Sequence, residues 1–211
     1  MSRPITAQQF HDADGVDDWR VVFEGACAHF RTGTFASGVA LVDAIGRVTE
    51  GRHPAVDLRP DSVTVRLGAG EGGITDDDLA LAVRISTAAR ELGVPADPSA
   101  IQTVQIAIDA MVGPDVMPFW RAVLGYRELG EEDLVDPHGR GPSLWFQVMD
   151  APRSQRNRIH VDVSVPHDQA EARVAAALAA GGRLVSAHAP QYWTLADSEG
   201  NEVDVATWQG R

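Results

Sequence analysis

The second half of the chain runs twice through one order of predicted elements: a strand, a helix and then further strands. The predicted strands lie at residues 104–109, 134, 143–149, 157–165, 183–187, 192–197 and 202–208. The predicted helices lie at 116–124, which ends at Gly125, and at 168–180, which Asp168 caps with Glu171 three residues later. Such a repeat limits this half to a fold in which two similar α+β units of about fifty residues pack together.

The strand at 157–165 carries the chemistry-bearing residues of the second unit. Its valines and Ile159 alternate with polar residues, among them His160 and Asp162. If the polar face lines a cavity, the imidazole of His160 can bind a metal or move a proton. If it does not, His160 is a partly buried, hydrogen-bonded histidine, because period two alone does not distinguish a solvent face from an interior face.

Charge and composition exclude several classes of function. The net charge of -12 argues against nucleic acid or an anionic membrane as a partner, so small molecules and proteins remain. All 18 basic residues are arginine, which excludes a lysine Schiff base, pyridoxal phosphate bound through one, and a Walker A loop. The single Cys27 and the absence of a signal-like or membrane-spanning apolar run lead us to expect a cytoplasmic protein.

A proline- and glycine-containing stretch at 93–100 predicts a domain boundary, with one domain at 1–97 and the other at 98–211. In the first domain we expect two strands within 18–32, a helix at 34–49, a strand at 62–67 and a second helix capped by Thr75. The last helix should bury a stripe of Leu81, Ile85, Ala88 and Leu92. The predicted fold class is α+β with a small antiparallel sheet and helices in this domain.

The first domain resembles the pterin-4a-carbinolamine dehydratases over about residues 5–93. The resemblance rests on His53-Pro54, the strand at 62–67, the turn Gly72-Gly73-Ile74-Thr75, and Asp78. It implies catalytic roles for His53 and Asp78 and ligand binding near Arg52. Arg52 stands where the family has a first histidine, and Ala69-Gly70 replaces a Thr-His pair, so two of the three family histidines are absent.

This departure predicts that ordinary dehydratase activity is lost, because neither arginine nor glycine exchanges protons near neutral pH. Structural readings also stand beside the catalytic ones. His53 can be a helix-end residue before a proline, and Asp78 can be an acid in the first turn of a helix, where the helix dipole favours it.

The second domain resembles the glyoxalase and bleomycin-resistance group, the vicinal oxygen chelate family. The resemblance rests on the repeat and on the segments Phe119–Tyr126 and Asp197–Asp204. It implies paired βαβββ units that form a cup, with metal-ligating places at Gln105, Gln147, His160 and Asp204. Glutamine at residue 147 offers only a dipole to a divalent metal, so the same four residues can instead be polar anchors of a metal-free ligand pocket.

These observations predict a small-molecule-binding fusion protein that forms homo-oligomers and has no certain cofactor. The expected ligand is pterin-like or aromatic. The expected ligand-binding residues are Arg52 in the first domain and Gln105, Gln147, His160 and Asp204 in the second, where His160 and Asp204 should face each other across the pocket. One alternative is a lyase that dehydrates a 4a-hydroxytetrahydropterin-like metabolite. The other is a metal-dependent glyoxalase-type lyase or isomerase, with His53 or His160 moving protons.

Overall fold

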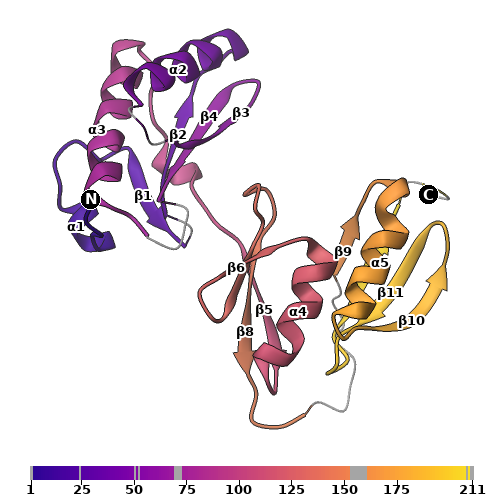
Figure 1. Ribbon diagram of the computed structural model, residues 1–211. Helices are drawn as coiled ribbons and strands as arrows, with labels where there is room; N and C mark the ends of the chain where they lie inside the picture. The colour runs from indigo at the N-terminus through magenta and orange to yellow at the C-terminus, as the bar shows by residue number, and fades with distance from the viewer. Residues whose placement is uncertain are drawn as a thin grey trace. The chain divides into compact units, whose positions relative to one another are not determined.

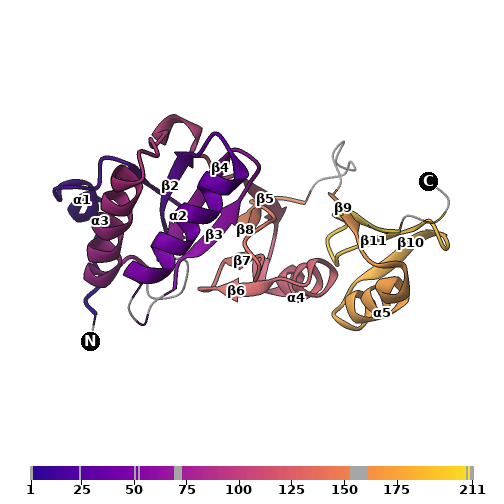
Figure 2. The ribbon, with the colours of Figure 1, turned by 90° about the horizontal axis from the view of Figure 1, so that it is seen from above.

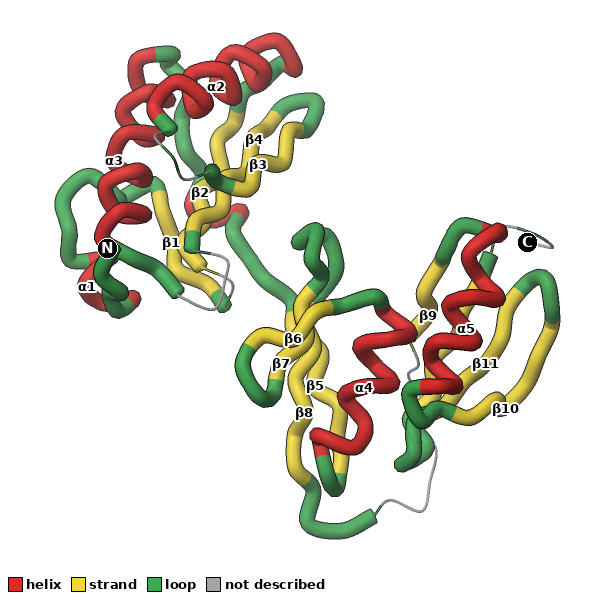
Figure 3. Tube along the Cα trace, viewed as in Figure 1, coloured by secondary structure: helices red, strands yellow, loops and turns green. Residues whose placement is uncertain are grey.

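The computed structural model describes residues 2–23, 25–49, 51, 53–68, 73–152, 161–207 and 209. The chain divides into two compact units, Met1–Thr103 and Val104–Arg211. Secondary structure in both units mixes helices with strands, so the α+β class is confirmed (Figures 1 and 3). None of the helices within the described ranges is long and apolar enough to cross a membrane.

The first unit is a sheet with helices packed on it. Its elements are α1 (Ala7–His11), β1 (Trp19–Val22), β2 (Gly25–Arg31), α2 (Phe35–Val48), β3 (Ala55–Leu58), β4 (Ser62–Leu67), α3 (Asp76–Glu91) and the 3-10 turn η1 (Pro98–Ala100). The strands pair antiparallel in the order β1-β2-β4-β3. Helices α2 and α3 lie side by side, and their apolar faces share a core with Phe10, Trp19 and Phe30 (Figure 1).

Most local predictions in this unit are confirmed. The strands at 18–32 and 62–67 and both long helices are present, and Thr75 caps α3 as expected. Leu92 is 46% exposed, because the helix ends before it completes the predicted stripe. The stretch predicted as a linker is partly fixed to β2, since Pro95 accepts a hydrogen bond from the Arg31 backbone N–H at 2.9 Å.

The second unit contains the predicted repeat. Its elements are β5 (Gln105–Ala110), α4 (Gly113–Leu124), β6 (Arg127–Leu129), β7 (Asp133–Val135), β8 (Ser143–Val148), β9 (Val161–Ser164), the 3-10 turn η2 (His167–Gln169), α5 (Ala170–Ala179), β10 (Arg183–His188), β11 (Tyr192–Ala196) and β12 (Glu202–Ala206). Among the described residues the two sheets have the orders β5-β8-β7-β6 and β9-β12-β11-β10. In each sheet the first and last strands of the repeat pair in parallel.

One core joins the two repeats. Helices α4 and α5 pack against each other, and Trp120 and Phe119 of α4 share a cluster with Leu195 and Val203 of the other repeat (Figure 2). Because strand side chains alternate, the residues between these apolar ones project from the face of each sheet opposite its helix. That opposite face is where the candidate site lies.

The predicted cap of the helix at 168–180 is wrong. Residues 167–169 form the 3-10 turn η2, and α5 begins at Ala170 without a side-chain cap. Pro166 precedes that turn with φ -53° and ψ 136°, and Asp168 lies inside the turn instead of capping the helix.

Candidate functional site

Two aspartates meet on the polar face of the second repeat. Strands β9 and β12 pair in parallel with Asp162 opposite Asp204, while Val161, Val163, Val203 and Val205 face the helix side. Neighbouring strands lie about 4.8 Å apart, so the two carboxylates leave the sheet side by side. Asp204 is half-buried and Asp162 is exposed.

The neighbouring strand β11 adds an aromatic residue to this face. Tyr192 is opposite Ala206 and Thr194 is opposite Asp204 in the β11–β12 register. The Tyr192 ring stacks on the His188 ring, with centroids 4.7 Å apart and an angle of 29° between the planes. This stacking restricts the tilt of the tyrosine ring beside the carboxylates.

Gln191 is fixed by its backbone. Its N–H donates to the carbonyl of His188 at 2.9 Å, and its carbonyl accepts from the Thr207 N–H at 2.9 Å. The hydroxyl of Thr207 also donates to the carbonyl of Pro190 at 2.7 Å. The chain before β11 is therefore tied to the end of β12, which holds Gln191 at one end of the polar face.

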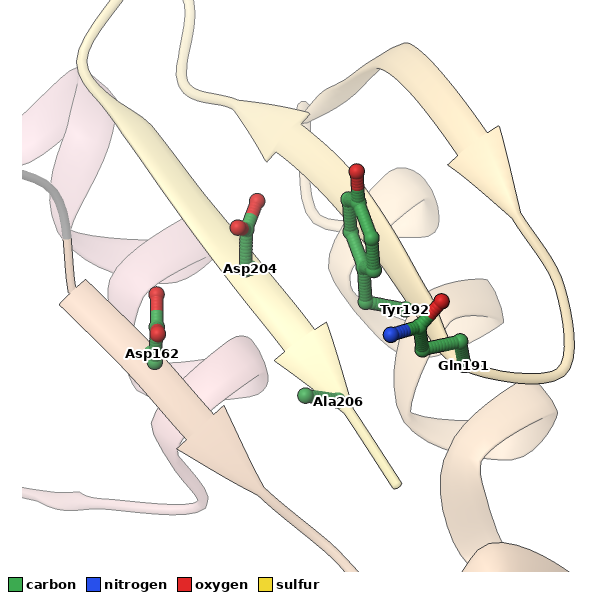
Figure 4. Close-up of a pocket in the computed structure, with 5 residues that line it drawn as sticks. All are labelled: Asp162, Gln191, Tyr192, Asp204 and Ala206. Atoms are coloured by element: carbon green, nitrogen blue, oxygen red, sulfur yellow. The ribbon is translucent and has the colours of Figure 1, made fainter. Parts of the chain in front are cut away.

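These residues line a pocket of about 190 Å³, formed by Asp162, Gln191, Tyr192, Asp204 and Ala206 (Figure 4). In Figure 4 the side chains of Asp162, Asp204 and Tyr192 stand up from one side of the sheet, and the small Ala206 lies on the same strand as Asp204. The pocket offers carboxylate oxygens as acceptors, a phenol that donates and accepts, and an amide that does both.

The predicted site residues of the second domain are only partly brought together. Asp204 lines the pocket, and its predicted role in ligand binding stays a prediction. His160 lies outside the described residues, so its predicted position across from Asp204 stays a prediction. The alternation within residues 157–165 predicts Asp162 on the polar face, but Gln191 and Tyr192 are not among the predicted site residues. Tyr192 had a usable signal, because it shares its strand face with Thr194.

The two predicted glutamines lie on the other sheet, and the structure does not bring them together. Gln105 is opposite Ser143, and Gln147 is opposite Asp109, so the glutamines are four residues out of register on adjacent parallel strands. At about 3.3 Å per residue this separates them by roughly 13 Å along the strands. Ligand oxygens must lie within about 2.6 Å of a divalent ion, so this pair does not fit a shared metal. The described part of the chain contains no group of three or more His, Cys, Asp or Glu residues that could hold a metal ion.

In the first unit, Asp78 has the structural role that its position also predicted. It is fully buried, and its Oδ2 accepts hydrogen bonds from the Thr75 N–H at 2.9 Å and the Thr75 hydroxyl at 2.8 Å. This is a capping box at the start of α3. His53 is exposed just before β3, and Arg52 lies outside the described residues.

Comparison with known families assigns each unit. Residues 3–88 match the family model of pterin 4 alpha carbinolamine dehydratase, and residues 105–206 match that of a glyoxalase-like domain. A comparison with curated proteins gives no significant match.

Two of the solved structures that are similar to about half of the chain have glyoxalase-related names. A glyoxalase-related enzyme from Fulvimarina pelagi is 18% identical, with 50% of this chain and 87% of that chain covered and a TM-score of 0.42. A glyoxalase/bleomycin resistance protein/dioxygenase family enzyme from Burkholderia phytofirmans PsJN is 16% identical, with 49% and 95% covered and a TM-score of 0.40. The two family matches fall on separate compact units, and the chain is thus a fusion of a pterin-4a-carbinolamine dehydratase-like domain with a glyoxalase-like domain.

Proposed function

We propose that the protein is a small-molecule-binding fusion protein whose ligand occupies the pocket on the polar face of the second repeat. The observation that carries this proposal is the direct register of Asp162 with Asp204 inside a pocket that Tyr192 and Gln191 complete. A volume of about 190 Å³ is below the roughly 300–1,000 Å³ of drug-sized sites, so it suits a small metabolite or one end of a larger one.

We propose that this binding uses side chains without a resident metal. The separation of Gln105 from Gln147 supports this, because a four-ligand site would need both glutamines near one ion. Adding Zn²⁺, Mn²⁺ or Ni²⁺ to protein freed of metal should leave ligand affinity unchanged. A tenfold gain in affinity on adding any of them would instead favour the metal-dependent alternative.

Binding can be tested by screening compounds below about 200 Da with ligand-observed NMR. Hits should be lost in Asp204→Asn and retained in Glu171→Gln, which removes the same charge from an exposed position on α5. We also expect His160→Ala to abolish binding with little change in the free energy of unfolding, since polar cavity residues contribute less to packing than the valines behind them. Hits that survive Asp204→Asn would contradict the assigned pocket.

For the dehydratase-like unit we propose a loss of ordinary dehydratase turnover. Arg52 cannot exchange protons near neutral pH, and Asp78 is engaged in capping α3. Turnover of a 4a-hydroxytetrahydropterin should equal the uncatalysed rate. Activity that disappears in His53→Ala would show that a single histidine suffices.

We further propose that this unit mediates self-association. Phe35 and Val39 lie one turn apart on α2 and are 56% and 47% exposed, which leaves an apolar strip open to a second copy. Sedimentation at micromolar concentration should show a species larger than 22.6 kDa, and Val39→Asp should shift it toward the monomer. A wild-type monomer under these conditions would refute the proposal.

A further inference from the structure

We infer that the sheet β5-β8-β7-β6 binds a planar nitrogen heterocycle on its helix-free face, stacked on the indole of Trp145 with its N–H donors directed at the carboxylate of Asp133. This site shares no residue with the pocket proposed above. It rests on three features of that face: an aromatic ring outside the described core, polar groups that lack partners, and the placement of two glutamines.

Strand register builds this face. Leu144 and Phe146 of β8 belong to the core that α4 covers, so Trp145 between them projects from the opposite side of the sheet. The register places Trp145 directly between Ala107 of β5 and Asp133 of β7. Ala107 is exposed and contributes only a methyl group, which leaves room for a flat ring over the indole.

Trp145 differs from two tryptophans that have structural roles. Trp19 and Trp120 are buried, and their indole N–H groups donate to the side chains of Ser86 and Asp197, each at 3.0 Å. Trp145 is half-buried, and its indole has no hydrogen-bond partner among the described residues. A partly exposed indole on a polar strand face offers a flat apolar surface on which planar rings stack.

Two polar groups beside the indole lack partners within the described ranges. The half-buried carboxylate of Asp133 accepts no hydrogen bond there, and burial raises its pKa. The hydroxyl of Ser143, two residues before Trp145 on the same strand face, is fully buried and also without a partner. Buried polar groups in folded proteins nearly always have a hydrogen-bond partner, so two unpaired groups on one face indicate that a bound molecule approaches it.

Hydrogen-bonding capacity selects the class of ring. The carboxylate of Asp133 only accepts when ionised, so it favours a ligand edge that donates. Two adjacent N–H groups of a nitrogen heterocycle match a carboxylate as a guanidinium does, and such charge-assisted bonds are about twice as strong as neutral ones. An anionic ring would be repelled by the carboxylate, and a saturated ring would not lie flat on the indole.

Gln105 and Gln147 flank this position along the strands. Gln105 is two residues before Ala107, which is opposite Trp145, and Gln147 is two residues after Trp145. Each glutamine therefore lies about 7 Å along the strands from the row that contains the indole. Both are exposed, and their amides donate and accept. The pair is too far apart to share a metal ion, but it is suitably placed to bind substituents at opposite ends of a ring between them.

The inference can be tested on the full-length protein with three probes of similar size: isocytosine, uracil methylated at both ring nitrogens, and trimethyleneurea. Isocytosine is planar with adjacent N–H donors, dimethyluracil is planar without N–H donors, and trimethyleneurea carries N–H donors on a saturated ring. Backbone amide and indole N–H NMR shifts would be followed, with the Trp145 indole signal assigned from Trp145→Phe. We expect isocytosine to shift the signals of Trp145 and Asp133 and to bind at least about tenfold more tightly than either other probe, because a hydrogen bond to a charged group and ring stacking each contribute about that factor.

Variants separate the two contributions. Asp133→Asn should weaken isocytosine binding about tenfold and leave dimethyluracil binding unchanged, whereas Trp145→Ala should weaken both about tenfold. The matched control Glu171→Gln removes the same charge from an exposed position on α5 and should change neither. Urea midpoints would establish that each variant is folded, and Asp133→Asn tests the donor edge even if Trp145→Ala does not fold.

Equal affinities for the three probes would overturn the inference, and so would isocytosine binding that Asp133→Asn leaves unchanged. Absence of shifts at Trp145 and Asp133 with millimolar isocytosine would overturn it as well. If isocytosine shifts Tyr192 instead and this binding is lost in Asp204→Asn, the inference fails while the pocket of the proposed function stands. The two sites can therefore fail separately.

Discussion

The pKa values of two aspartates in the glyoxalase-like unit, Asp136 and Asp133, are shifted in opposite directions by their surroundings. Burial raises the pKa of Asp136, but backbone N–H donors from His138, Arg140 and Gly141, together with the Arg140 charge, lower it more, so its pKa lies below the usual value. Burial raises the pKa of Asp133, and the neighbouring negative charge of Glu132 raises it further. The first carboxylate organises a turn through hydrogen bonds of 2.8 to 2.9 Å, whereas no donor among the described residues offsets the burial of the second in this way.

We therefore expect Asp136→Asn and Asp133→Asn to change stability in different directions. The lowered pKa of Asp136 means that its charge stabilises the fold above the unfolded-state pKa of about 3.9, and that this contribution is lost as the pH falls through the folded-state pKa. Asp136→Asn should cost about 1 kcal/mol at pH 7, a modest value because solvent still screens this partly buried carboxylate. The deficit should shrink in acid.

For Asp133 the sign is reversed. A raised folded-state pKa gives a contribution that is present below the unfolded-state pKa and lost as the pH rises through the folded-state value. Asp133→Asn, which is neutral at every pH, should leave stability at pH 7 unchanged or slightly higher. Urea denaturation between pH 3 and pH 7 would measure both variants. Equal losses at pH 7 would show that the two environments do not differ as described.

At the scale of elements, the loop between β11 and β12 forms hydrogen bonds that connect the second repeat to the first. Asp197 is fully buried and accepts a hydrogen bond from the Trp120 indole N–H of α4 at 3.0 Å. The carboxylate of Glu199 accepts from the backbone N–H groups of Met111 and Val112 at 2.6 to 3.0 Å, just before α4 begins. Because β12 follows this loop, these hydrogen bonds also help to position the strand that carries Asp204.

Removing the indole donor should therefore weaken the unit more than removing a similar ring elsewhere. We expect Trp120→Phe to cost about 2 to 3 kcal/mol, since it leaves a buried carboxylate short of a donor as well as removing ring volume. Trp145→Phe is the comparison, and its cost should be smaller, because the Trp145 ring is only half-buried on the polar face of β8 and Trp120 is buried. Urea midpoints would compare the two. Losses of equal size would mean that the bond to Asp197 adds nothing beyond packing.

The elements also show what local sequence can and cannot predict. The spacing of apolar residues in α2 predicts a helix but not which of its faces is buried. Phe35 and Val39 are exposed, while Gly38, Leu41 and Ile45 face the core. A Cβ on Gly38 would lie 2.5 Å from Leu58 of β3, so the close approach of this short strand helps select the buried face. Apolar spacing within one helix cannot reveal that approach, because β3 was not itself predicted.

The candidate site divides in the same way. The strand phase of Asp204 was predictable from alternation, which is a local property. Its neighbour Asp162 depends on the register between strands forty residues apart, and Gln191 depends on backbone bonds to residues at the end of β12. Pairing between distant segments does not alter the hydrophobic periodicity of either segment. Which residues line the pocket therefore could not be predicted from local sequence and became known only from the fold.

At the scale of the whole molecule, the chain carries two separate hydrophobic cores. The described core of the first unit draws on residues up to Val94 and Ala96, and that of the second begins at Ile106. Units of about one hundred residues are large enough to bury a core that supports folding alone. The division between Thr103 and Val104 falls between the two family matches, which end at residue 88 and begin at residue 105.

Separate cores predict separate unfolding. Leu41 in the first unit and Leu195 in the second are both fully buried, so replacing either with alanine should cost about 2 to 5 kcal/mol. In calorimetry of the full-length protein, we expect two transitions, with Leu41→Ala lowering the midpoint of one and Leu195→Ala lowering the midpoint of the other, each by at least about 8 °C. The two variants serve as controls for each other, since they make the same chemical change. A single transition that both variants lower would mean that the two units unfold as one cooperative body, because a cavity in either core would then destabilise the whole chain.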